Sequence, residues 1–137
     1  GGSSPSTSFD CSGFVCWVFT NSGVHNLPRT TAQGIYDQCT PVSAADAKAG
    51  DIIFFTGTYN SAGAVSHVGI YCGNGVMIHC GDPIKYASIN TSYWQVIFMR
   101  LVAYQEIKCP VTIKFDNFAI KIDNLQLCLI KTASQRN

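Results

Sequence analysis

Residues 66–80 read SHVGIYCGNGVMIHC, which is two runs of apolar and β-branched residues around a Gly-Asn-Gly turn. Runs of this kind predict β-strands, and the turn sequence is typical of a tight hairpin. We therefore expect antiparallel strands at residues 67–72 and 76–80. This hairpin decides the fold class, because the other strands predicted in the first three quarters of the chain, at 52–55 and 96–102, flank it in the sequence.

The length of the turn decides whether His67 and His79 share a face of the sheet. Side chains alternate between the two faces, and directly paired residues share a face. A three-residue loop at 73–75 pairs Gly69 with His79. His67 then lies diagonally from His79 on the same face, at roughly 7 Å between backbone positions. A two-residue loop would pair His79 with Ile70, on the other face from His67. A site built on both histidines therefore requires the odd loop.

Helices are predicted ahead of these strands. Segment 11–22 has apolar residues at helical spacing, Asp10 is a good N-cap, and Gly23 is a natural residue just past the helix end. Shorter helices are expected to begin near Thr30 and at Ser43. Helices followed by antiparallel strands indicate an α+β fold, with N-terminal helices packed on an antiparallel β-sheet.

The chain is expected to have two parts of unequal size. Residues 1–104 form the main domain, and residues 105–137 form a C-terminal β-rich extension of unknown role. Within the extension, alternating residues around Asp116-Asn117 predict a further hairpin, and 125–130 predict a last strand. We interpret it as a packing extension and not as a separate binding module.

The composition is that of a folded globular protein, with 47% hydrophobic and 12% charged residues among 137. The net charge is +1 without a basic cluster, so nucleic-acid binding is not expected. No apolar run is long enough to span a bilayer, which argues against membrane insertion, and no signal peptide is visible. We expect a monomer without a cofactor.

Seven cysteines are present, at positions 11, 16, 39, 72, 80, 109 and 128. The odd count leaves at least one thiol free, and the absence of a C-x-x-C pair argues against zinc-ribbon and thioredoxin-like sites. Most are expected to be small buried side chains. Cys11 differs because it lies at the first turn of the predicted helix. The helix dipole and free N–H groups there should lower its pKa and could hold an oxyanion, and Gly13 would let a substrate backbone approach closely.

A thiol nucleophile needs a base, which is best oriented by a third group. His67 and His79 are the candidates, because they flank the hairpin turn and Gly69 leaves open space beside His67. His25 follows the first helix, and we interpret it as a surface residue. A metal site made by Cys11 and the two strand histidines is the alternative. The position of the thiol at a helix start favours a nucleophile, so no metal is expected.

These residues stand in motifs that together resemble the NlpC/p60 cell-wall peptidases. The motifs are FDCSGF at 9–14, LPRT at 27–30, AGDIIFF at 49–55, SHVGIY at 66–71 and MIH at 77–79. They occur in the family's order over about residues 1–104. The resemblance implies a papain-like core and a secreted or wall-associated bacterial protein. It implies hydrolysis of peptidoglycan stem peptides, commonly between D-glutamate and the following diamino acid.

The resemblance also implies catalytic roles. Cys11 would be the nucleophile, His67 its base, and His79 the polar residue that orients the base. Two alternatives to a peptidase stay open at this point. One is an amidase or acyltransferase on the same Cys/His scaffold, and the other is a catalytically incomplete wall-binding domain.

Asp10 and Ser12 match family positions that help to bind the substrate, in some members the free amine of an N-terminal L-alanine. Ser66 is expected to be a further substrate-binding residue. Asp10 is also the expected helix cap, and both roles can coexist. The family usually has a Tyr and a Trp just before the Gly-Gly that starts this sequence, and that Tyr contributes to the oxyanion site. We therefore expect an N-terminally truncated domain that lacks part of the oxyanion site.

Overall fold

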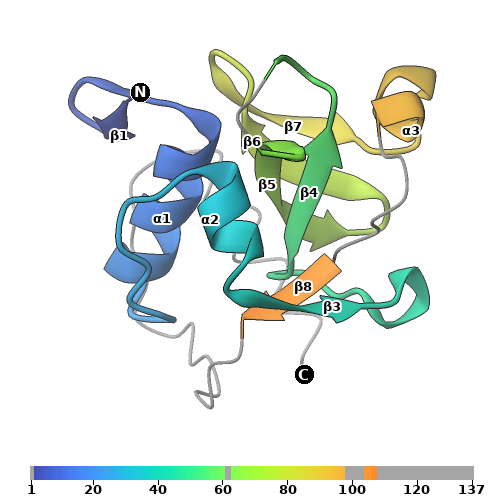
Figure 1. Cartoon of the computed structure of the whole chain (residues 1–137), viewed down its shortest axis with the longest axis horizontal. Coiled ribbons are helices and arrows are strands. Elements are labelled where there is room, and N and C mark those ends of the chain that lie inside the picture. The colour runs from blue at the N-terminus through green and yellow to red at the C-terminus, as the bar shows by residue number, and fades with distance from the viewer. Residues whose placement is uncertain (1, 61–62, 98–103, 108–137) are drawn as a thin grey trace.

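The computed structural model describes residues 2–60, 63–97 and 104–107. Its centre is a six-stranded antiparallel sheet in the order β3-β8-β4-β5-β6-β7, with helices α1 and α2 on one face and α3 towards the other (Figure 1). The expected α+β fold, with N-terminal helices on an antiparallel sheet, is confirmed. The elements are β1 (Ser3–Ser4), β2 (Ser8–Phe9), α1 (Cys11–Asn21), α2 (Ala32–Tyr36), β3 (Cys39–Val42), η1 (Ala44–Asp46), β4 (Ile52–Thr56), β5 (Val65–Gly73), β6 (Val76–Cys80), β7 (Ile84–Ser88), α3 (Ser92–Ile97) and β8 (Tyr104–Ile107).

Helix α1 begins and ends where the sequence predicts. The Asp10 carboxylate accepts a hydrogen bond of 2.7 Å from the Gly13 N–H, which satisfies one of the free donors of the first turn. Ser22 caps the other end, and Gly23 follows with φ +72°, the left-handed conformation that glycine adopts at no steric cost. The buried side of the helix packs on the sheet face formed by β5 and β6, through Phe14, Val15, Val18, Val68, Ile70 and Ile78.

The two shorter helical segments also have side-chain caps. Thr31 caps α2 by accepting from the Gly34 N–H at 3.0 Å, one residue later than the predicted start. Ser43 caps η1 by accepting from the Asp46 N–H at 3.2 Å. Among the residues that the structure describes, no helix is long and apolar enough to cross a bilayer.

The β5–β6 hairpin reaches the required register by a route that the sequence analysis did not foresee. Gly73 pairs with Val76, so the loop is the two-residue Asn74-Gly75, whose φ angles of 53° and 70° suit a tight hairpin turn. That loop alone would place His79 on the wrong face. A β-bulge between Tyr71 and Gly73 inserts one unpaired residue and shifts the register by one. Gly69 therefore pairs with His79 as predicted, although the three-residue loop is wrong.

The prediction of a strand at residues 96–102 is wrong at residues 96 and 97, the part that the structure describes, because α3 continues through Ile97. Thr91 explains the helix: its carbonyl accepts from the Gln95 N–H at 3.0 Å, and its hydroxyl accepts from the Trp94 N–H at 3.5 Å. This start outweighs the β-branched residues that follow. Residues 98–102 and the hairpin and strand predicted within 108–137 lie outside the described residues.

Five strands, β1, β2, β3, β7 and β8, were not predicted. Residues 1–8 were expected to be loop, but β1 and β2 form a small hairpin there. Strand β3 pairs with β8, which also reaches β4 through the pairing of Ile52 with Gln105. Strand β7 pairs with β6 and places Lys85 directly opposite His79.

Candidate active site

A hydrogen bond joins the two strand histidines. The Nε2 atom of His67 lies 2.8 Å from the Nδ1 atom of His79. Gly69, the residue paired with His79, makes this approach possible, since a Cβ there would lie 3.1 Å from the His79 Cβ and 3.0 Å from the Ile78 carbonyl oxygen. Because Nε2 of His67 is engaged, its Nδ1 is the ring atom left for proton exchange.

Aromatic rings enclose the histidine pair. Trp94 of α3 stacks on His67 with ring centroids 5.6 Å apart and an interplanar angle of 26°, and it meets the His79 ring edge to face at 5.2 Å. Phe55, which pairs with His67 across β4 and β5, packs on Trp94 at 4.6 Å. These contacts hold both imidazoles in place and exclude water from the bond between them. No signal in the sequence analysis marked Trp94, because it lies just before the predicted strand.

Burial keeps both imidazoles neutral near pH 7. Burial, with a smaller contribution from the charge of neighbouring His79, lowers the pKa of His67 from 6.5 to about 4. Burial also lowers the pKa of His79 to about 4, with a second contribution from the positive charge of Lys85. Each imidazole therefore has a lone pair available at neutral pH.

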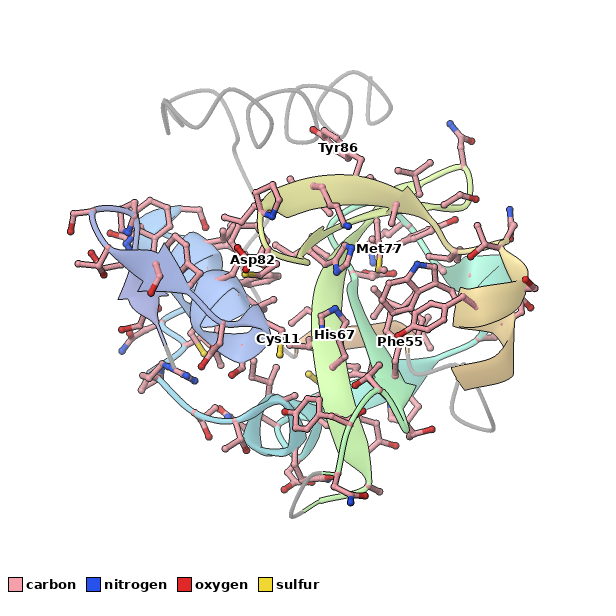
Figure 2. All side chains as sticks on the ribbon, turned by 90° about the horizontal axis from the view of Figure 1, so that it is seen from above. Cys11, Phe55, His67, Met77, Asp82 and Tyr86 are labelled. Carbon is pink, nitrogen blue, oxygen red and sulfur yellow. The ribbon has the colours of Figure 1, made fainter. Side chains whose placement is uncertain are left out.

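Cys11 lies at the first residue of α1, at the end of the helix that approaches β5. Figure 2 shows its side chain beside the strand that carries His67. The sulfur is close to the backbone N–H groups of Val68 and Ser12, both of which favour the thiolate. Val68 follows His67 in β5, so the Cys11 thiol lies beside the residue next to His67.

The expected fall in the pKa of Cys11 is wrong for the free protein. Burial raises the pKa, and the negative charges of Asp10 and ionised Cys80 act in the same direction. The hydrogen bonds from Val68 and Ser12 oppose this without reversing it. With His67 neutral as well, the resting state is a neutral thiol beside a neutral imidazole, and not an ion pair.

The expected role of Gly13 also changes. A Cβ at Gly13 would lie 2.1 Å from the carbonyl oxygen of Gly2, which itself accepts a hydrogen bond of 2.9 Å from the Asp10 N–H. The missing side chain therefore admits the protein's own N-terminal segment against the start of α1. Close approach by a substrate backbone is not needed to explain this glycine.

Asp10 and Ser12 belong to a polar cluster completed by Arg29. The Arg29 guanidinium donates to the Asp10 carboxylate at 2.5 Å and to the Ser12 hydroxyl at 2.9 Å, and the Ser12 hydroxyl in turn donates to Asp10 at 3.2 Å. Ser12 is buried, whereas the Asp10 and Arg29 side chains are 34% and 39% exposed. The cluster thus offers one carboxylate edge to solvent next to Cys11. In the sequence, Arg29 stands within the LPRT motif at 27–30, and no role was predicted for it.

Ser66 lies in a different place from these residues. It is 1% exposed, its hydroxyl accepts from the Thr58 N–H at 2.9 Å, and it lies 2.5 Å from the Thr58 hydroxyl. It is also the extra residue at the bulge between β4 and β5. In the free protein, Ser66 therefore stabilises the connection between these strands. His25 lies in the loop after α1 and is partly buried, whereas it was expected at the surface.

The other cysteines among the described residues offer no competing centre. Cys16 is buried, Cys39 and Cys80 are partly buried free thiols, and Cys72 is disulfide-bonded, which corrects the expectation that it is a simple buried thiol. Within the described part of the chain, no group of three or more His, Cys, Asp or Glu side chains is placed to hold a metal ion.

The site thus combines a thiol at a helix start, a buried histidine pair and an adjoining polar cluster of Asp10, Ser12 and Arg29. Residues 1–103 match the sequence profile of the NlpC/P60 family. The chain belongs to the NlpC/P60 family. A curated relative in this family is the bifunctional muramidase/DL-endopeptidase CwlT of Bacillus subtilis, 45% identical over 109 residues, which are 79% of this chain and 31% of the relative. The chain thus spans about a third of that relative's length.

Solved structures of the NlpC/P60 family have the same fold. A lipoprotein-like NLP/P60 family protein from Staphylococcus aureus superposes with a TM-score of 0.71 at 44% identity, covering 78% of this chain and 35% of that one. RipD of Mycobacterium tuberculosis, described as a non-catalytic NlpC/p60 protein adapted to peptidoglycan binding, gives a TM-score of 0.50 at 28% identity, covering 61% of this chain and 60% of that one. The family therefore includes both a hydrolase and a binding protein.

Proposed function

We propose that this chain is the catalytic domain of a peptidoglycan hydrolase, a cysteine endopeptidase acting on stem peptides. The observation that carries the proposal is the buried bond between His67 Nε2 and His79 Nδ1. It commits one nitrogen of His67 to an orienting partner and leaves the other for the thiol of Cys11. Relatedness to a DL-endopeptidase supports the bond between D-glutamate and the diamino acid as the target.

The proposed reaction starts from the neutral pair. His67 takes the Cys11 proton on Nδ1 as the sulfur attacks the amide carbonyl carbon. The backbone N–H of Cys11 at the helix start holds the oxyanion that forms. His67 then gives its proton to the leaving amine, which departs and leaves a thioester. Finally His67 removes a proton from water, the hydroxide attacks the thioester, and the new carboxylate departs as the thiol regains its proton.

The polar cluster of Asp10, Ser12 and Arg29 supports binding of the acyl half of the substrate. The partly exposed Asp10 carboxylate lies one residue before the nucleophile, where it suits a free amine at the start of a short peptide. Arg29 holds that carboxylate in one orientation through two contacts of its guanidinium within the cluster. A substrate with a free N-terminal amine is therefore expected to be preferred over an N-acetylated one.

The proposal is tested by replacing single thiols. Cys11→Ser should abolish cleavage of a defined muropeptide, measured by chromatography and mass spectrometry of the products, while the thermal unfolding temperature is kept. Cys39→Ser is the matched control, because Cys39 is also a partly buried cysteine but lies on β3. Full activity of Cys11→Ser would overturn the proposal. If the folded wild-type protein binds muropeptides without cleaving them, the chain is instead a wall-binding domain.

The same assay separates a peptidase from an acyltransferase. The thioester can be resolved by water or by an amine, and the two outcomes give different products. Adding a high concentration of an amino-acid amide and measuring the ratio of transfer product to free acid decides between them. We expect the free acid to dominate.

A further inference from the structure

A pocket of about 600 Å³ lies next to the histidine pair, on the face of the sheet that α3 covers. Its walls include His67, His79, Gly81, Lys85 and Trp94, but not Cys11. The thiol and the polar cluster at the start of α1 therefore lie on one side of His67, and this pocket extends on another. Because His67 must protonate the leaving amine, the pocket is placed to receive the amine half of the substrate. This step rests on the proposed function.

Lys85 gives the pocket its charge. It is the one side chain with a permanent charge among the described residues that line the pocket. It pairs directly with His79 across β6 and β7, so both side chains project from the same face. A Cβ at Gly81 would lie 2.7 Å from Lys85 Cε and 3.2 Å from His79 Nε2, which puts the end of the lysine next to the imidazole edge.

The outer nitrogen of His79 has an unused hydrogen-bonding capacity. His79 is 3% exposed, and its Nε2 atom is buried without a hydrogen-bond partner among the described residues. A buried polar group in this state is costly and is a common sign of a binding site. Nε2 is the ring atom that faces the space beside Gly81 and Lys85.

The tautomer of His79 links this atom to catalysis. For His67 to accept a proton on Nδ1, it must carry its hydrogen on Nε2 and donate it to His79 Nδ1. His79 must then carry its own hydrogen on Nε2. The opposite tautomer, in which His79 donates to His67, leaves no lone pair on His67 Nδ1. A lysine ammonium, which only donates, favours that inactive tautomer, whereas an acceptor at His79 Nε2 favours the active one.

We propose that His79 Nε2–H and the Lys85 ammonium bind a carboxylate on the leaving-amine half of the substrate, and that this carboxylate sets the catalytic tautomer of the histidine pair. The exposed lysine moves aside from Gly81 to admit the carboxylate between the two donors. No covalent step is added. The substrate supplies an acceptor that completes the chain from His79 to His67 to Cys11.

Two carboxylates can play this part: the side-chain carboxyl of a diamino acid such as diaminopimelate, or the C-terminal carboxyl of the leaving fragment. Four peptides separate them, with L-Ala-γ-D-Glu followed by diaminopimelate or by lysine, each with a free or an amidated C-terminus. We expect kcat/KM of the wild type to fall about tenfold when the relevant carboxylate is removed from the peptide. This is the effect expected from the loss of one charge-assisted hydrogen bond in a solvent-accessible pocket.

Lys85→Gln should erase this preference, and Lys85→Arg, which keeps the charge, should retain it. If Lys85→Gln keeps the wild-type preference for peptides with the carboxylate, the inference is overturned. It is also overturned if the wild type cleaves all four peptides equally. Loss of the preference supports it, and the pair of peptides that shows the loss identifies the carboxylate.

A binding measurement keeps the inference separate from the proposed function. In protein with ¹⁵N-labelled histidines, free diaminopimelate should shift the Nε2 resonance of His79 towards a protonated, hydrogen-bonded nitrogen. The shift should be lost in Lys85→Gln. If the wild type cleaves no peptide, the proposed function fails, and this titration still decides whether the carboxylate site exists. An unchanged His79 resonance with excess diaminopimelate overturns it, and lysine amide, which has no carboxylate, is the negative control.

Discussion

Replacement of His79 by alanine tests the central contact of the site. In the wild type, His79 Nδ1 lies 2.8 Å from His67 Nε2, and His79 is 3% exposed. The alanine variant leaves the His67 Nε2–H without this acceptor, between the rings of Trp94 and Phe55. His67 can then turn or adopt the other tautomer, in which Nδ1 carries a hydrogen and cannot act as a base.

The expected loss follows from the burial of this contact. An unsatisfied donor in a buried site costs about 1–3 kcal/mol, and a lost hydrogen bond between neutral groups about 1 kcal/mol. A combined loss of about 3 kcal/mol in the transition state corresponds to a decrease in kcat/KM on the order of 100-fold. The decrease should appear mainly in kcat, because His79 orients the base and the acyl-half contacts at Asp10 are untouched.

Steady-state cleavage of a stem tripeptide, followed from pH 4 to pH 8, measures both effects. Besides the lower rate, the apparent pKa on the acid side of the kcat/KM profile should rise from about 4. Removing the His79 ring admits water to His67 and removes the repulsion from a charged His79. His79→Gln is the control, since its amide oxygen can still accept from His67 and should restore part of the rate. An alanine variant that folds, cleaves at the wild-type rate and keeps the wild-type pH profile would refute the orienting role.

Other predictions concern the surroundings of the pair. Asp10→Ala should lower the free energy of unfolding by about 1 kcal/mol through loss of the helix cap, whereas Asp10→Asn should keep most of the stability but raise KM for peptides with a free N-terminal amine; urea unfolding and kinetics measure the two effects. Trp94→Ala should lower kcat by exposing the histidine bond to water, and Trp94→Phe should retain more of it. Because the pKa of both His67 and His79 is lowered from 6.5 to about 4, the unfolded chain binds protons that the folded chain does not, so stability is complete above about pH 6.5 and falls towards pH 4. One such histidine accounts for about 3 kcal/mol at 1.36 kcal/mol per pKa unit, and urea midpoints that stay constant from pH 7 to pH 4 would contradict the depressed values.

The neutral resting pair has a consequence for thiol labelling. A thiolate at a helix start would react rapidly with alkylating reagents near neutral pH, as the sequence alone suggested. Burial that raises the pKa of Cys11 instead predicts slow labelling in the free protein. The proton then leaves Cys11 only when the substrate is in position, which protects the thiol from side reactions.

Features with local causes could be predicted from the sequence. The Asp10 cap, the turn residues Asn74-Gly75 and the alternation along β5 all depend on interactions within a few residues of the chain. The motifs around Cys11 and His67 gave the family. These are choices that backbone sterics and short-range hydrogen bonds make before the chain is compact.

The tertiary structure decided what depends on distant segments. The bulge at Cys72 restored a register that the two-residue loop would have lost, because only the packing of β5 against both β6 and α1 selects between the two faces. Arg29 and Trp94 were not among the expected site residues, and they reach the site from a loop and from a helix that was not predicted.

The direction of the Cys11 pKa also depends on the folded surroundings. A helix start favours the thiolate, but the desolvation imposed by the sheet outweighs it. The sequence by itself thus determined which side chains could do the chemistry and the local elements that carry them. The assembled sheet determined their register, their partners and their protonation, since burial and charge are properties of residues that are far apart in the chain.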